Sequence, residues 1–214
     1  MNWQDNPWFP TVLDKQRLED KEKRPESYEH IWEGGYLVFS EGAYYSTELR
    51  RAKDEARIGK VSYDRAKGVI TSWDLGIGDS TAIVFTQSVG RAVHVIDCYE
   101  NRNEGLPHYV DVLQRKQYLY GNHFAPHDIE VRELSTGKSR REIAYSLGIN
   151  FRVVPKLPVE DGIHAGQLLI PRTYFDAEKT KGLLDALRQY HRAYNERTRS
   201  FRNSPVHDWS SHFA

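Results

Sequence analysis

Two aspartates in this chain have the residue type and setting needed to bind a cation. Asp74 closes the β-branched run GVITSWD and is followed by a glycine two residues later, and Asp128 closes the strand-like segment HFAPHD. Taken singly, each has an ordinary explanation, because aspartate is common in turns and at helix caps. Two carboxylates brought to one edge of a sheet would instead repel each other unless a cation joined them. Such a pair, completed by a substrate phosphate, is the usual ligand set of Mg²⁺.

A second stretch, Gly137-Lys138-Ser139, matches the end of a nucleotide-binding P-loop. That loop needs an additional glycine five positions earlier, where this chain has Arg132. Without that first glycine the backbone cannot wrap a phosphate in the manner of a P-loop. The stretch is therefore interpreted as a basic turn and not as an ATP site.

The segments around the two aspartates predict how they are positioned. Residues 68–76, 80–88 and 92–100 are strand-like, and turns too short for any crossover join them into an antiparallel meander. Residues 107–120 have helical spacing, so the strand at 123–128 should return parallel to the first through a right-handed crossover. A helix at 139–147, a fifth strand at 151–155 and helices at 162–169 and 181–195 follow. This order predicts an α/β fold, a ribonuclease H-like mixed five-stranded sheet flanked by helices, in which Asp74 and Asp128 lie on neighbouring strands.

Composition limits the alternatives. Of the 214 residues, 28% are charged and 39% are hydrophobic, with a formal net charge of zero, which is typical of a soluble protein with a core. A nucleic-acid partner would have to be met by local basic clusters. The single cysteine, Cys98, excludes a disulfide framework and a cysteine-based zinc site. No apolar run approaches the roughly 18 residues of a membrane span, and a reducing, cytoplasmic setting is the simplest interpretation.

Residues 1–60 differ from the remainder of the chain. The stretch 14–35 is mostly charged and has too few apolar residues for an independent core. Helices are expected at 11–23 and 45–58, separated by the strand-like segment YLVFS. This pattern predicts a linker or appendage over residues 1–60 that docks onto a neighbour, and a ribonuclease H-like α/β domain over residues 61–214.

Four ordered motifs resemble a known family. SWDLGIGDSTA, APHDIEVRELSTGKSRREIAYSLGI, DGIHAGQLLIPRTYFD and HDWSSHFA are similar to the C-terminal nuclease domain of a tailed-bacteriophage terminase large subunit. The N-terminal DNPWFP and YEHIWEGGYLVF resemble the segment that joins the packaging ATPase of that protein to its nuclease. The resemblance implies a divalent-metal-dependent endonuclease that cleaves concatemeric double-stranded viral DNA during genome packaging, with two Mg²⁺ or Mn²⁺ ions.

The same resemblance implies the partners and the catalytic acids. The partners are double-stranded DNA, an upstream ATPase domain of the same protein, and the portal and small terminase subunit, with no membrane. The place of action is the host cell cytoplasm, at the procapsid portal. Asp74 and Asp128 match two catalytic and metal-binding acids of the family. The third is expected after HDWSSH and two further residues, just beyond Ala214, and Asp208 is the alternative.

Other residues have both a functional and an ordinary interpretation. Asp79 is expected either beside the metal ligands or in the turn before the second strand, and Asp161 and His164 either near the site or at a helix start, where Asp161 suits an N-cap. For His207 and His212, capping and packing are favoured over a role in the site.

The basic residues and the rival functions complete the set of expectations. Given the resemblance, Lys138, Arg140 and Arg141 are predicted to contact DNA phosphates, and the arginine run at 188–202 is either a solvated face or a further phosphate contact.

Two rival functions stay open: an integrase- or transposase-like strand transferase of the same fold, and a non-catalytic module that docks on the portal or capsid.

Overall fold

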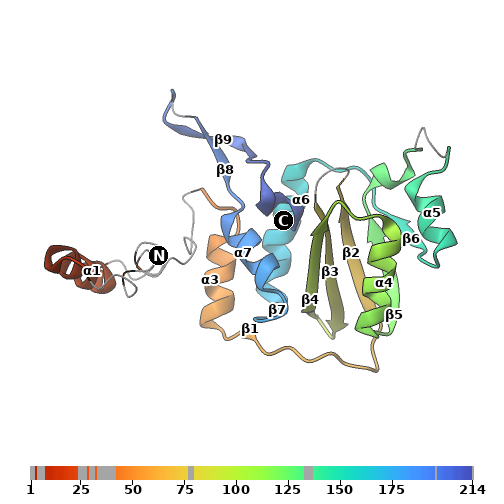
Figure 1. Ribbon diagram of the computed structural model, residues 1–214, viewed down its shortest axis with the longest axis horizontal. Coiled ribbons are helices and arrows are strands. Elements are labelled where there is room, and N and C mark those ends of the chain that lie inside the picture. Colours follow the sequence, from red (N-terminus) through yellow and green to blue (C-terminus); the bar gives the residue numbers. More distant parts are fainter. Residues whose placement is uncertain are drawn as a thin grey trace.

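The computed structural model describes residues 3, 8–23, 28, 32, 42–76, 80–132, 137–195 and 197–213. Its centre is a seven-stranded sheet with the order β1-β7-β4-β3-β2-β5-β6 (Figure 1). The strands are β1 (Ile58–Gly59), β2 (Val69–Leu75), β3 (Ser80–Val89), β4 (Ala92–Arg102), β5 (Tyr120–Ala125), β6 (Phe151–Val153) and β7 (Thr173–Asp176). The helices are α1 (Thr11–Lys23), α3 (Ser46–Asp54), α4 (Leu106–Lys116), α5 (Arg140–Ser146), α6 (Val159–Leu169) and α7 (Lys181–Gln189).

The central strands confirm the predicted meander. β2 pairs antiparallel with β3, and β3 pairs antiparallel with β4. Along β2 the side chains alternate, with Trp73 and Leu75 buried and Ser72 and Asp74 exposed, because successive residues of a strand point to opposite faces. The return through α4 is also confirmed, since β5 lies beside β2 and runs parallel to it.

The prediction of five strands was incomplete. The five expected strands form the continuous order β4-β3-β2-β5-β6, and β7 and β1 extend this sheet in parallel beyond β4. These two added strands have four and two residues. Strands this short show too little alternation to be recognised in a sequence, so their pairing partners decide their structure.

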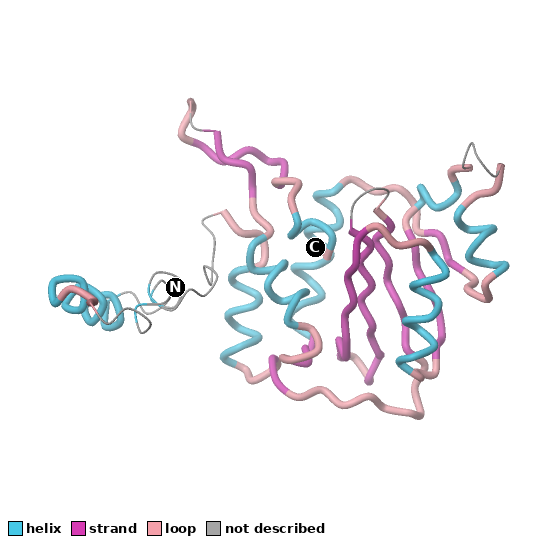
Figure 2. Tube along the Cα trace, viewed as in Figure 1, coloured by secondary structure: helices cyan, strands magenta, loops and turns pink. Residues whose placement is uncertain are grey.

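Helix ends account for the other differences from the expected elements. α4 ends at Lys116, followed by Gln117 as its C-cap with a left-handed φ of 53°, whereas helical spacing was expected to continue to residue 120. α7 ends at Gln189, and the residues expected to continue this helix form β8 (Arg192–Asn195), which pairs with β9 (Ser200–Pro205). Figure 2 shows this β8–β9 hairpin extending away from the sheet and its helices.

Helices cover both faces of the sheet, and each face has its own core (Figure 1). Under α4 and α5, the core contains Trp73, Phe85 and Phe151. Under α3, α6 and α7, the second core contains Leu49 of α3 and Leu184 of α7. Residues within the first sixty thus pack on the domain core through α3, and a domain boundary at residue 60 stays a prediction.

The N-terminal helices follow the expectations closely. α1 spans the expected residues 11–23, and α3 is a shorter form of the helix expected at 45–58. The strand-like YLVFS lies outside the described residues. Among the residues that are described, no helix has the length and apolar character needed to cross a membrane.

Candidate metal centre

Asp74 is the penultimate residue of β2, at the carboxyl end of the strand. Its neighbours Trp73 and Leu75 are buried on the α4–α5 face, so the Asp74 side chain is on the opposite face and is 49% exposed. The strand is therefore held by its apolar residues, and it presents a carboxylate to solvent at one edge of the sheet.

Asp128 lies in a single 3₁₀ turn, η2 (His127–Glu130), and not on a strand as predicted. β5 ends at Ala125, and Pro126 in an extended conformation leads into the turn. Ile129 is fully buried and fixes the turn against the core, while Asp128 is exposed. Because Ser72 pairs with Phe124 in the parallel ladder, the carboxyl ends of β2 and β5 leave the sheet side by side.

A chain of polar contacts joins β2 to β5 beneath this edge. Trp73 Nε1 donates to Thr71 Oγ1 at 2.7 Å, and Thr71 Oγ1 lies 2.7 Å from His123 Nδ1 across the β2–β5 ladder. Burial lowers the pKa of His123, which favours the neutral imidazole. Since Thr71 Oγ1 already accepts from Trp73, its own proton is available to the neutral Nδ1 of His123. The two strands that lead to Asp74 and Asp128 are thus joined by side chains as well as by backbone.

The C-terminal segment contributes His212 to the surroundings of Asp74. His212 ends the 3₁₀ turn η4 (Trp209–His212), is 8% exposed, and places Nδ1 3.6 Å from Asp74 Oδ2. Asp208 caps this turn, with Oδ1 accepting from Ser210 N at 2.9 Å and from Ser210 Oγ at 2.6 Å. The sequence favoured packing for His212, and only the folded chain shows that it packs against a candidate ligand.

The third acid stays a prediction. One oxygen of Asp208 accepts the hydrogen bonds that cap η4. The role of Asp208 as a metal ligand stays a prediction from the sequence. Within the described part of the chain, no three His, Cys, Asp or Glu side chains are grouped closely enough to hold a metal ion. The arrangement that the structure provides is therefore two exposed carboxylates on adjoining segments, with His212 against one of them.

The outer residues named from the sequence lie elsewhere or cannot be placed. Asp79 is outside the described residues. Asp161 does not cap α6, because that helix begins at Val159 and its N-cap is Pro158. His164 lines a cavity of about 270 Å³ at the base of the β8–β9 hairpin, and the lining of this cavity includes neither Asp74 nor Asp128.

The basic turn before α5 lies beside the site and is bonded to it. Gly137 adopts a left-handed φ of 67°, and Ser139 opens α5 with a capping box to Glu142. Arg140 Nη1 donates to Leu75 O at 3.1 Å, and Arg141 Nη1 contacts Glu130 Oε1 at 2.6 Å. Two of the three predicted DNA-binding side chains thus contact the segments that contain Asp74 and Asp128.

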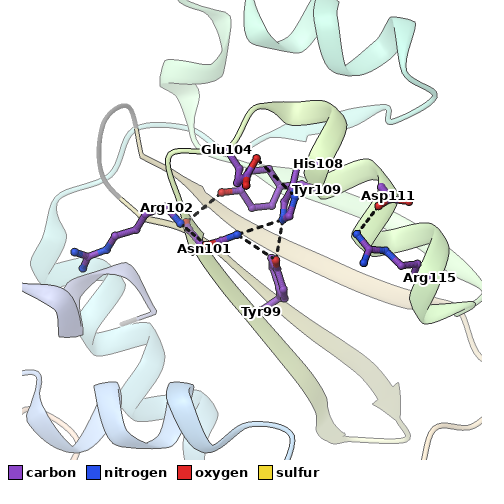
Figure 3. Close-up of polar contacts among 8 residues, drawn as sticks. All are labelled: Tyr99, Asn101, Arg102, Glu104, His108, Tyr109, Asp111 and Arg115. Atoms are coloured by element: carbon purple, nitrogen blue, oxygen red, sulfur yellow. Dashed lines mark hydrogen bonds and ion pairs between the residues drawn. The ribbon is translucent and has the colours of Figure 1, made fainter.

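A separate polar network fixes the carboxyl end of β4 to the start of α4 (Figure 3). His108 Nε2 lies 2.8 Å from Tyr99 Oη and 3.4 Å from Asn101 Nδ2, and Nδ1 lies 3.7 Å from Glu104. Tyr109 donates from its hydroxyl to Asn101 O at 3.1 Å. These groups satisfy one another, and the network anchors the start of α4 to β4.

Comparisons with known proteins match this architecture. No protein-family model and no curated protein matches the sequence. Solved structures match the fold. The large terminase of a thermophilic bacteriophage, solved with ATP-γ-S, aligns over 99% of this chain at 12% identity and a TM-score of 0.60. The fold is similar to that of the nuclease domains of phage large terminases. The P22 large terminase nuclease domain aligns over 70% of this chain and 81% of its own length, at 15% identity and a TM-score of 0.51.

A third structure was solved with a metal. The large terminase nuclease of the thermophilic phage G20c, with bound cobalt, aligns over 81% of this chain and 94% of its own length, at 15% identity and a TM-score of 0.52. The chain spans only 52% of the large terminase that was solved with ATP-γ-S. The ribonuclease H-like fold predicted from the sequence is thereby confirmed.

Proposed function

We propose that this chain contains the endonuclease domain of a phage terminase large subunit, which cleaves concatemeric double-stranded viral DNA during genome packaging with divalent metal ions. The observation that supports this most directly is the parallel pairing of β2 with β5, after which Asp74 and Asp128 follow at one edge of the sheet. The likeness of the fold to terminase nuclease domains, one of them solved with cobalt, agrees with it.

The residues at this edge fit a hard divalent cation. Asp74 and Asp128 offer exposed carboxylate oxygens, the donors that Mg²⁺ and Mn²⁺ prefer. These two acids, with Asp208 as the predicted third, would hold the metal, and two ions are expected. A pair of such ions supplies an activated water and stabilises the leaving oxygen of a phosphodiester.

The protein groups around the acids orient the site and the substrate. The buried imidazole of His212 lies against one side of the carboxylate of Asp74, with Nδ1 3.6 Å from Oδ2. Lys138 lies in the exposed turn before α5, where its ammonium group can contact a phosphate of the duplex. Such contacts position DNA without reading its bases, which suits an enzyme with little sequence preference.

The β8–β9 hairpin provides a second basic surface. Both of its strands are largely exposed, and Arg192, Arg197, Arg199 and Arg202 lie along it or at its tip. Isolated two-stranded hairpins gain little from burial, so a charged partner such as the DNA backbone would stabilise this one.

The remaining partners rest on the family alone. Because the chain spans about half of the large terminase solved with ATP-γ-S, we place the ATPase domain in another part of the same protein. The portal and the small terminase subunit complete the proposed partners, and the proposed place of action is the host cell cytoplasm at the procapsid portal.

Nicking of supercoiled plasmid DNA by the purified chain tests the proposal. We expect cleavage in Mg²⁺ or Mn²⁺ and none in EDTA, with loss of cleavage in Asp74→Asn and in Asp128→Asn. Asp111→Asn is the matched control, because Asp111 is an exposed carboxylate on α4 that pairs with Arg115. A product in which a DNA 3′ end is joined to a second duplex would favour a strand transferase. Absence of cleavage in either metal would favour the non-catalytic docking module.

A further inference from the structure

Two consecutive arginines at the start of α5 reach the two segments that present the acids. Arg140 donates from Nη1 to the carbonyl oxygen of Leu75 at 3.1 Å, one residue after Asp74. Arg141 places Nη1 2.6 Å from Oε1 of Glu130, in the same 3₁₀ turn as Asp128. One short helix is therefore bonded to both sides of the candidate metal centre.

The geometry of α5 allows this division. Successive residues of a helix project about 100° apart, so neighbouring arginines extend toward different elements. Arg140 is half-buried against the end of β2, and Arg141 lies on the exposed side facing η2. The capping box fixes the start of the helix, with Ser139 N donating to Glu142 Oε2 at 2.7 Å and Glu142 N donating to Ser139 Oγ at 3.2 Å.

The contact of Arg141 contributes little to holding the fold. The ion pair of Arg141 with Glu130 has side chains that are 46% and 54% exposed, and exposed pairs of this kind contribute little to stability. The β2–β5 ladder and the buried Ile129 already fix the two segments in the core. The contacts act instead at the end of β2 and in η2, the two positions that set the distance between the carboxylates of Asp74 and Asp128.

We propose that Arg140 and Arg141 are positioning residues that set the placement of Asp74 relative to Asp128 for a divalent cation. This inference rests on the proposed function. It also gives these arginines a different role from the phosphate contact expected from the sequence, and leaves Lys138 as the residue of this turn that faces the DNA.

Mn²⁺ binding to the intact chain tests the proposal without relying on cleavage. Free Mn²⁺ is measured by electron paramagnetic resonance in the absence of DNA for the wild type, Arg140→Gln and Arg141→Gln. Loss of a group bonded directly to a metal ligand typically weakens metal binding about 10–100-fold. Because Arg140 and Arg141 bond to neighbours of the two acids and not to the acids themselves, we expect a weakening below that range for Arg140→Gln and a smaller one for Arg141→Gln. Duplex affinity in EDTA should change less than about twofold, since the phosphate contacts are retained.

Two controls separate positioning from folding. Arg115→Gln removes an exposed ion pair of the same type on α4 and should leave Mn²⁺ binding unchanged. The exchange Glu130→Arg with Arg141→Glu restores the pair with reversed charges, and it should recover the Mn²⁺ affinity lost in Arg141→Gln. Thermal unfolding of each variant verifies that it is folded, and Arg140→Lys, which keeps a donor, replaces Arg140→Gln if that variant is not.

The outcomes are distinguishable. Unchanged Mn²⁺ affinity in both arginine variants, with a duplex affinity that falls about tenfold and depends less on salt, would assign the arginines to phosphate and overturn the inference. A wild-type chain that binds Mn²⁺ but cleaves no DNA would overturn the proposed function while leaving the positioning role intact. A wild-type chain that binds no Mn²⁺ would overturn both.

Discussion

The sheet and the turn that follows β5 contain two kinds of aspartate, and they differ in what surrounds them. Asp97 on β4 and Asp176 on β7 are each 7% exposed and lie between elements of the core. Asp74 and Asp128 are exposed at the edge where β2 and β5 end. All four are carboxylates in one small domain, so the difference comes from position and not from chemistry.

The carboxylates of both buried aspartates accept hydrogen bonds from other groups of the protein. Asp97 Oδ2 accepts from Lys116 Nζ at 2.5 Å and from Tyr118 Oη at 3.0 Å. Asp176 accepts from the backbone N–H of Val61 at 3.1 Å and of Lys179 at 3.0 Å. Burial of a charge is costly unless such partners are present, so removing either carboxylate would leave its buried partners uncompensated. The carboxylates of Asp74 and Asp128 are instead exposed to water. A cation and a phosphate can replace that water.

The largest expected effect separates the two kinds by activity. Asp74→Asn or Asp128→Asn should lower the rate of metal-dependent plasmid nicking by at least about 100-fold, since loss of even an outer partner of a metal ligand commonly costs 10–100-fold. The melting temperature should change little, because both side chains are exposed. Nicking rates and thermal unfolding of the same preparations check this. A folded variant that nicks DNA at the wild-type rate would remove that aspartate from the site.

The next effect is on stability. Asp97→Asn should lower the free energy of unfolding by about 3 kcal/mol, because it leaves the ammonium group of Lys116 poorly compensated in a largely buried position. Urea denaturation measures the change. A loss below about 1 kcal/mol would show that this pair resembles an exposed ion pair, and the proposed contrast with Asp74 would fail.

The third effect is on the pH dependence of stability. Burial alone would raise the pKa of Asp176, but the backbone N–H groups of Lys179, Val61 and Glu178 outweigh it, and the net pKa is lowered. The folded state therefore binds a proton less readily than the unfolded state does. The stabilisation is complete above the unfolded pKa of about 3.9 and is lost as the pH falls through the lower folded value. Urea denaturation from pH 6 down to acidic pH should show that the free energy of unfolding falls less steeply in Asp176→Asn than in the wild type. Equal slopes of this free energy against pH would contradict this assignment.

The smallest effect concerns Ser139, which caps the start of α5 beside the two exposed acids. Ser139→Ala removes the side-chain half of the capping box and should cost about 1 kcal/mol of stability. If α5 positions the acids, Mn²⁺ affinity should also fall, by less than in Arg140→Gln. Calorimetric titration with Mn²⁺, compared with urea denaturation of the same variant, checks both. A stability loss with no change in Mn²⁺ binding would separate the start of the helix from the metal centre.

The sequence was sufficient for the parts of the fold that local pattern determines. Alternation in residues 69–75, tight turns on either side of β3 and the helical spacing of α4 together predicted the meander and the crossover. The crossover then required β2 and β5 to be neighbours, and it is this topology that brings the segments of Asp74 and Asp128 together. Long-range adjacency was predictable here because it follows from the order of the elements.

The sequence was not sufficient where a single distant contact decides the structure. β7 and β1 are strands because they pair with each other and with β4. The contact of His212 with Asp74 and the bond from Arg140 to Leu75 join residues far apart in the chain, and they leave no periodicity in the sequence. Asp128 was expected on a strand, but Pro126 and the buried Ile129 turn the chain into η2 before it.

Anomalous diffraction from a crystal soaked in Mn²⁺ is the most direct test of the central claim, that Asp74 and Asp128 together hold a divalent cation. We expect an anomalous peak at the carboxyl edge of β2 and β5 in contact with a carboxylate oxygen of each aspartate, and its loss in a crystal of Asp74→Asn. No peak at this edge at saturating Mn²⁺, or a peak that persists unchanged in Asp74→Asn, would contradict the account.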